Sequence, residues 1–145
     1  MPAGKPEAGH RLATHTADVL IEAWAPDWHA CLVEAVNALV ESFADVTDSA
    51  AQAGPRQAPF RIDAHEPEDQ VVELLDEVIY RLDAEDVVPV NVELEDCDAG
   101  LQGWFDVVPV QAIAQTGPAP KAVALHGLTV QRDDSGWSCR VLVDV

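Results

Sequence analysis

The chain has 145 residues, the size of one domain, and such a domain buries about 68–70% of the surface that its unfolded form exposes. Its 26 acidic and 8 basic residues give a formal net charge of −18, although the 48% apolar content is ordinary for a globular protein. Tight binding of a nucleic-acid backbone needs clustered lysines and arginines. These are scattered here, so direct tight binding of RNA or DNA is not expected.

Residues 1–11 are expected to form a disordered tail, followed by a single domain over residues 12–145. The first thirteen residues contain two prolines and two glycines, and no apolar stretch that would make a secretory signal. No segment approaches the ~18–20 apolar residues of a membrane span. The three cysteines, Cys31, Cys97 and Cys139, are odd in number and far apart, which is typical of a reduced, cytoplasmic protein.

A core strand and a helix are predicted first along the chain. Residues 19–24 are largely apolar and β-favouring, and Pro26 ends the run. Asp27 can then cap a helix whose apolar residues draw one continuous stripe with a period of 3.6. The stripe consists of Trp28, Cys31, Leu32, Ala35, Val36, Leu39, Val40 and Phe43. His29 lies off this stripe, so we interpret it as an exposed helix residue and not as the partner of a catalytic Cys31.

The middle of the chain predicts a loop, a strand and a second helix. Residues 45–59 have no period and collect alanine, glycine, proline and polar residues, as surface loops do. Residues 60–65 alternate with period two, which predicts a strand with one wet face. The second helix is predicted to begin at Pro67, with Glu68 and Asp69 in its first turn, where carboxylates favour the positive end of the helix dipole.

The rest of the chain predicts four strands. The first pair covers residues 87–95 and 101–110, joined by an acidic turn, with a bulge expected at Gly103. The second pair is a hairpin of residues 121–130 and 137–145. The last strand is expected to place two sets of side chains on opposite faces. These are Trp137, Cys139, Val141, Val143 and Val145 on one face, and Ser138, Arg140, Leu142 and Asp144 on the other.

The order of these elements predicts the α+β class. Strand, helix, strand and helix are followed by four strands that are connected by short turns. We expect a two-layer fold, with a mostly antiparallel sheet of about six strands and two helices packed on one face.

Acidic residues at two predicted strand ends are candidates for a metal site. Asp18 opens the first core strand, and Asp144 stands next to Val145 and its terminal carboxylate. If the two strand ends are neighbours, three oxygen donors meet. A hard cation such as Ca²⁺ or Mg²⁺ would relieve their repulsion with ligand distances of about 2.0–2.6 Å. The alternative is that these aspartates stand at strand ends because strands disfavour Asp and loops accept it.

Three motifs carry a resemblance to a known family. They are the tetrad His15-Thr16-Ala17-Asp18 before the first core strand, Lys121-Ala122-Val123 with His126, and the ending Arg140-Val141-Leu142-Val143-Asp144-Val145. In this order, and with the segments between them, they resemble archease, a small acidic protein that assists the 3′-phosphate RNA-splicing ligase. The likeness spans residues 12–145, which would form one archease-like domain. Ala124 and Leu125 replace the Thr-Tyr of the family's Lys-Ala-Val-Thr-Tyr-His strand.

The resemblance implies a non-enzymatic helper. Archease promotes guanylylation of the active-site histidine of the RNA-splicing ligase, with GTP and metal belonging to the ligase, and so supports repeated turnovers in tRNA splicing and RNA repair. Its own divalent metal ion is held by the tetrad Asp and the C-terminal Asp, here Asp18 and Asp144. The terminal carboxylate of Val145 is a plausible third donor, and the metal could be Ca²⁺ or Mg²⁺.

Three further residues of the motifs have two interpretations each. Lys121 is either a counter-charge beside the metal site or a solvated lysine at a strand start. We favour a turn-fixing role for His15 over metal ligation, because hard cations prefer oxygen. We expect His126 to be packed or to face a partner, and not to act as a base.

The sequence allows two function classes other than the ligase helper. One is an α+β module that holds a cation or small ligand for a different protein partner. The other is a hydrolase, which would need a nucleophile and a base held together. No Ser or Cys has a recognisable elbow motif or a paired His, so the hydrolase is the least favoured.

Overall fold

A computed structural model describes residues 7–14, 18–47 and 56–145 of the chain. Within these ranges there are two α-helices, α1 (Trp28–Glu41) and α3 (Pro67–Glu85), and one short 3-10 helix, η1 (Val110–Ala112). The strands are β1 (Gly9–Thr14), β2 (Asp18–Ala25), β3 (Ala44–Asp45), β4 (Arg56–Ile62), β5 (Val87–Cys97), β6 (Gly100–Pro109), β7 (Ala114–Gln115), β8 (Ala122–Asp133) and β9 (Gly136–Asp144). Of the described helices, none is both long and apolar enough to cross a membrane.

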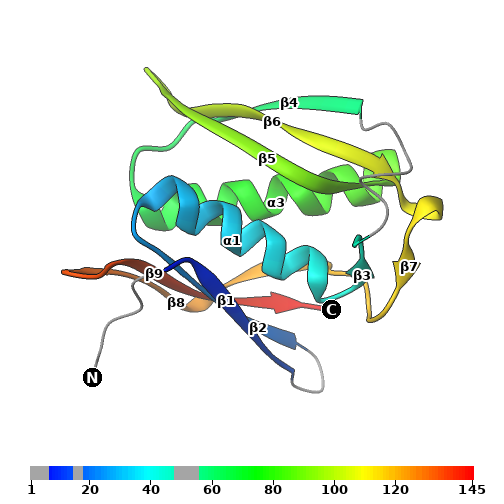
Figure 1. Cartoon of the computed structure of the whole chain (residues 1–145), viewed down its shortest axis with the longest axis horizontal. Helices are drawn as coiled ribbons and strands as arrows, with labels where there is room; N and C mark the ends of the chain where they lie inside the picture. The colour runs from blue at the N-terminus through cyan, green and yellow to red at the C-terminus, as the bar shows by residue number, and fades with distance from the viewer. Residues whose placement is uncertain (1–6, 15–17, 48–55) are drawn as a thin grey trace.

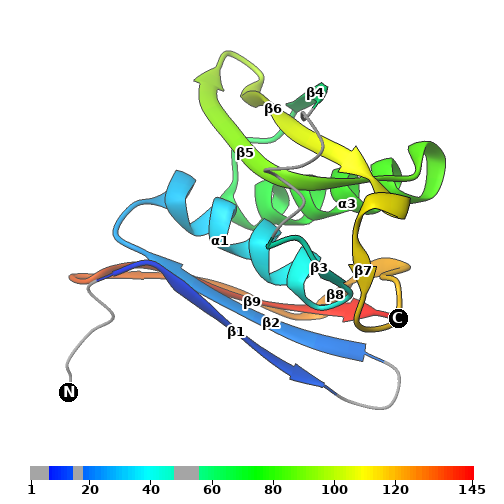
Figure 2. The ribbon, with the colours of Figure 1, turned by 45° about the vertical axis from the view of Figure 1, so that its right-hand side comes forward.

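The strands form two main antiparallel sheets with the helices between them. One sheet has the order β1-β2-β9-β8, the other β4-β6-β5, and β3 pairs with β7 separately. Figures 1 and 2 show α1 and α3 in the middle of the molecule, with one sheet above and the other below. The α+β class and the mostly antiparallel pairing are confirmed. The predicted arrangement of one sheet with helices on one face is wrong, because the helices are covered on two sides.

Helix α1 explains this layering. Its buried residues are Cys31, Leu32, Ala35, Val36, Ala38, Leu39 and Val40, which cover more than half of its circumference. A helix that is buried this widely packs against more than one partner, and α1 contacts β2 and β9 of one sheet and β5 of the other. Its N-cap is as predicted, since the Asp27 carboxylate accepts a hydrogen bond from the backbone N–H of Ala30 at 2.9 Å.

Helix α3 begins at Pro67 as predicted, with Glu68 and Asp69 in its first turn. It ends at Glu85 and is capped by Asp86, whose φ of 54° lies in the left-handed region. That conformation turns the chain directly into β5, because the strand begins at the next residue.

Two strand starts and the position of one bulge differ from the sequence analysis. Strand β1 starts at Gly9, inside the segment expected to be a tail, and β4 starts at Arg56, inside the predicted loop. The bulge is also placed differently, because the register of β5 and β6 shifts between Pro89 and Asn91 and stays regular at Gly103. Gly103 has another reason to be glycine: a Cβ there would collide with the carbonyl of Glu93 on the neighbouring strand.

Candidate metal centre

Asp18 and Asp144 lie directly opposite each other, as the first residue of β2 and the last residue of β9. Directly paired residues of antiparallel strands project to the same face, with Cβ atoms about 4.5–5.5 Å apart. The start of β2 and the end of β9 are therefore neighbours, and the C-terminus lies at the end of the sheet where β2 begins (Figure 2). The structure brings together two carboxylates that are far apart in the sequence.

The register that pairs them is fixed by the core. Along β2 the residues alternate between half-buried and buried, and Val19 is 4% exposed. Its partner Val143 is fully buried against the same helices. A slip of β2 by one residue would move Val19 and the other buried side chains of β2 to the outer face, so the hydrophobic pattern determines that Asp18 faces Asp144. Both aspartates project from the face of the sheet that the helices do not cover.

Asp18 provides the clearest sign that these residues fit a cation. Its Oδ1 atom is buried and has no hydrogen-bond partner among the described residues. A buried acceptor without a donor is unfavourable by roughly 1–3 kcal/mol, and more when it is charged. A hard cation would satisfy this oxygen, so the donor set at Asp18 and Asp144 fits Ca²⁺ or Mg²⁺.

The available ligands are few. Within residues 7–14, 18–47 and 56–145, no three His, Cys, Asp or Glu side chains come together in a metal-binding group. Among the described residues, Asp18 and Asp144 are paired here, and the terminal carboxylate of Val145, one residue beyond β9, is a candidate third donor. His15 lies outside the described residues. A cation here would keep several water ligands, as Mg²⁺ usually does.

The strand β8 runs beside Asp144 and carries the Lys motif. The backbone N–H of Lys121 donates to the carbonyl oxygen of Asp144 at 2.8 Å, and Ala122 is the paired residue. The Lys121 side chain is exposed and forms no ion pair with a carboxylate of the described chain. Its backbone therefore helps to hold the end of β9, and the role of its charge stays a prediction.

His126 lies in an irregular stretch of β8. Between Ala124 and Thr129 the strand advances five residues while β9 advances two, from Leu142 to Arg140. The three extra residues form an exposed bulge, in which His126 is open to solvent and Leu125 is 68% exposed. His126 is thus not packed, and the interpretation that it faces a partner remains.

The arrangement of His29 and Cys31 does not support nucleophilic catalysis. His29 Nε2 lies 2.9 Å from the Asp96 carboxylate at the surface, whereas Cys31 is fully buried. A hydrogen bond with Cys139, together with burial, raises the pKa of the Cys31 thiol. A thiol in this state is a poor nucleophile because the thiolate is the reactive form.

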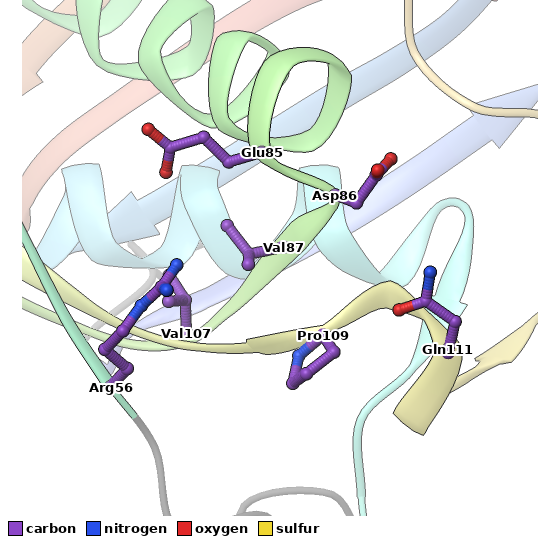
Figure 3. A pocket seen from close by; sticks show the side chains of 7 residues that line it. All are labelled: Arg56, Glu85, Asp86, Val87, Val107, Pro109 and Gln111. Atoms are coloured by element: carbon purple, nitrogen blue, oxygen red, sulfur yellow. The ribbon is translucent and has the colours of Figure 1, made fainter.

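A separate cavity of about 360 Å³ lies near the three-stranded sheet. Figure 3 shows Arg56 of β4 on one side, Glu85 and Asp86 at the end of α3 on the other, and Val87 between them. Asp18 and Asp144 belong to the other sheet, so this cavity is not part of the candidate metal centre.

Comparison with known proteins gives a family match over almost the whole chain. The model of the Archease protein family (MTH1598/TM1083) matches residues 10–145. A protein of Mycobacterium tuberculosis named probable protein archease is 41% identical over 145 residues, covering 99% of this chain and 79% of that protein. Protein archease of Pyrobaculum neutrophilum is 28% identical over 153 residues and is covered completely.

Two solved structures share the fold. The solution structure of protein 1598 from Methanobacterium thermoautotrophicum has a TM-score of 0.69 at 18% identity, covering 94% of this chain and 99% of that one. The crystal structure of an archease from Thermotoga maritima, described as a possible chaperone, has a TM-score of 0.67 at 20% identity. It covers 93% of this chain and 96% of that chain.

Proposed function

This chain belongs to the archease protein family, and on that basis we propose that it is a non-enzymatic accessory factor of the 3′-phosphate RNA-splicing ligase. In this role it promotes guanylylation of the ligase and its repeated turnover in tRNA splicing and RNA repair, in the cytoplasm. The GTP belongs to the ligase. The description of the Thermotoga maritima protein as a possible chaperone agrees with a helper role.

The observation that carries the proposal is the direct pairing of Asp18 with Asp144. The family motifs place two carboxylates there, and the buried, unsatisfied Oδ1 of Asp18 gives them a physical reason to hold a cation. Asp18 and Asp144 would hold a divalent metal ion, with the carboxylate of Val145 as a further oxygen donor. When bound, the ion would supply positive charge at an otherwise acidic end of the sheet.

The sheet of this chain would hold the two carboxylates in a fixed place for the metal ion. Two strands whose inner faces are locked in the core hold the two carboxylates at a fixed spacing, and the backbone of Lys121 supports the end of β9. A rigid sheet presents such a pair more accurately than a loop would. The pair also faces outward, where a partner protein can reach it.

The test is a guanylylation assay with the cognate ligase, GTP and metal. The initial rate of ligase guanylylation should rise when the protein is added. The variants Asp18→Asn and Asp144→Asn should remove the stimulation, because each takes away one anionic oxygen donor. Asp98→Asn, an exposed change in the β5–β6 turn, is the matched control and should stimulate as the wild type does. A ligase that is guanylylated equally fast with and without the protein refutes the proposal.

The alternative, a cation-binding module for a different partner, gives another result. Calcium or magnesium would then bind with dependence on Asp18, while the ligase would be neither bound nor accelerated. Isothermal titration with the metal, run beside the ligase assay, separates the two functions.

A further inference from the structure

The face of the four-stranded sheet that carries Asp18 and Asp144 also holds a hollow of about 210 Å³ nearer the other end of β2. Its side chains stand in two rows of directly paired residues across β2, β9 and β8. One row is Glu22, Arg140 and Thr129, and the other is Trp24, Ser138 and Gln131. Neighbouring strands are about 4.8 Å apart, and residues two apart along a strand are separated by roughly 6.6 Å. The hollow is therefore a small regular array of side chains.

Four side chains of this array can donate hydrogen bonds. Arg140 and Thr129 face each other in one row, and Ser138 and Gln131 face each other in the next. Ser138 is the smallest of them and lies between Trp24 and Gln131, which leaves the space that forms the hollow. The four donors therefore form two neighbouring cross-strand pairs that line the same hollow.

The local charge is opposite to that of the whole chain. Glu22 is the carboxylate that lines the hollow, and it is shared by two guanidinium groups. Arg11 Nε lies 3.0 Å and Arg140 Nε 3.5 Å from its oxygens, so two positive charges meet one negative charge. The side chain of Arg140 is 56% exposed, and it keeps donors free for another acceptor. In a chain with a net charge of −18, the cluster of Arg11, Glu22 and Arg140 has one more positive than negative group, with Arg11 standing next to the hollow and not in its lining.

Trp24 supplies an apolar wall beside the donors. Its ring lies across Gly9 of β1, where any side chain would collide with it. The ring therefore leans towards β1 while Trp24 still lines the hollow beside Ser138. An aromatic wall next to a guanidinium and hydroxyl groups is suited to an organic group that carries an anion.

We propose that this hollow binds a phosphate monoester of a small organic molecule. Arg140, Thr129, Ser138 and Gln131 donate to the phosphate oxygens, and the organic part packs against Trp24. A phosphate presents three terminal acceptor oxygens to the four donors, whereas a carboxylate presents two. The site lies four residues along β9 from Asp144, about 13 Å away, so it is distinct from the candidate metal centre.

The experiment is an NMR titration of the isolated full chain with phenyl phosphate, inorganic phosphate and benzoate. The chain has four tryptophans, and the indole signal of Trp24 is assigned with Trp24→Phe. Phenyl phosphate should shift this signal and the backbone amide signals of Ser138 and Thr129 saturably, and it should bind more tightly than the other two probes. No saturable shift at these positions overturns the proposal, and tighter binding of benzoate overturns the choice of phosphate.

Two substitutions with opposite effects distinguish a built site from general charge. Arg140→Gln should weaken phenyl phosphate binding about tenfold or more, because it removes a charge-assisted hydrogen bond. Glu22→Gln should strengthen binding, because it frees both arginines. Arg61→Gln makes the same charge change in the other sheet, where Arg61 pairs with Asp63 at 2.8 Å, and should leave the affinity unchanged. Equal weakening by Arg61→Gln contradicts the proposal. None of these measurements contains the ligase, so their failure would leave the proposed function untouched.

Discussion

Replacing Asp18 by Asn should change stability in opposite directions with and without a divalent metal. Two unit charges about 5 Å apart repel each other by roughly 0.8 kcal/mol in bulk water and by roughly 3 kcal/mol at an effective dielectric constant of about 20. Asp144 is exposed, so the lower part of this range applies. In a chelator, Asp18→Asn should therefore raise the free energy of unfolding by about 1 kcal/mol. For a chain of this length that corresponds to a rise in Tm of about 2–4 °C.

With metal the order should reverse. A ligand at one hundred times its Kd adds about 2.7 kcal/mol to the stability of the wild type, provided that it binds only the folded form. Asp18→Asn lacks one donor and should gain much less. Thermal unfolding followed by circular dichroism in EDTA and in excess Ca²⁺ or Mg²⁺ measures both effects, with Asp98→Asn as the control. The reasoning is refuted if metal raises the Tm of Asp18→Asn as much as that of the wild type.

Three further predictions concern the fold. Burial lowers the pKa of His10, but hydrogen bonds with Glu34 and Glu41 raise it by more, so its pKa lies above the ordinary 6.5 in the folded chain. The stabilisation that protonated His10 gives the folded chain is full below pH 6.5 and is lost as the pH rises through the pKa of His10 in the folded chain. His10→Gln should therefore flatten this part of a plot of Tm against pH. An unchanged slope contradicts the assignment. Asp27→Ala removes the N-cap of α1 and should lower the free energy of unfolding by about 1 kcal/mol in urea denaturation, whereas no loss would mean that the cap is dispensable. Leu39→Ala, at a position 1% exposed, should lower the free energy of unfolding by about 2–5 kcal/mol in the same assay. A smaller loss than that of the cap variant would argue against a central place for α1 in the core.

Features that depend on local sequence were predictable. The cap of α1 at Asp27 and the start of α3 at Pro67 follow from neighbouring residues, and both are confirmed. The hairpin of β8 and β9 is also confirmed, with Asp133 paired to Gly136 across a short turn. In each case the side chains that determine the structure lie within a few positions of one another.

Features that depend on distant pairing were not predictable. Alternation along β4, β5 and β6 reveals which residues are buried, but not that these strands form a sheet of their own across the helices. The start of β1 was missed because His10 breaks the apolar pattern. It points inward to Glu34 and Glu41 of α1, and a polar residue satisfied by a distant helix resembles a surface residue in the sequence.

The candidate metal centre and the hollow beside Trp24 also differ in how far the sequence predicts them. Asp18 and Asp144 stand out in the sequence as carboxylates at predicted strand ends and as parts of family motifs, and the register of β2 and β9 places them side by side. The sequence did predict that Ser138 and Arg140 share a face of the last strand. It gave no sign of the hollow, because Thr129 and Gln131 reach that face only after the bulge in β8.

The bulge in β8 has a consequence for how this surface can vary during evolution. In β2 and β9 the even-numbered positions point to solvent and the odd-numbered positions to the helices. Residues available for recognition therefore alternate with residues that pack in the core. An odd number of extra residues in β8 exchanges these assignments from Thr129 onward. Changing the length of that bulge by one residue would turn the outward side chains between Thr129 and Asp133 inward. Substitutions at the outward positions alone would instead change the surface and leave the core unchanged.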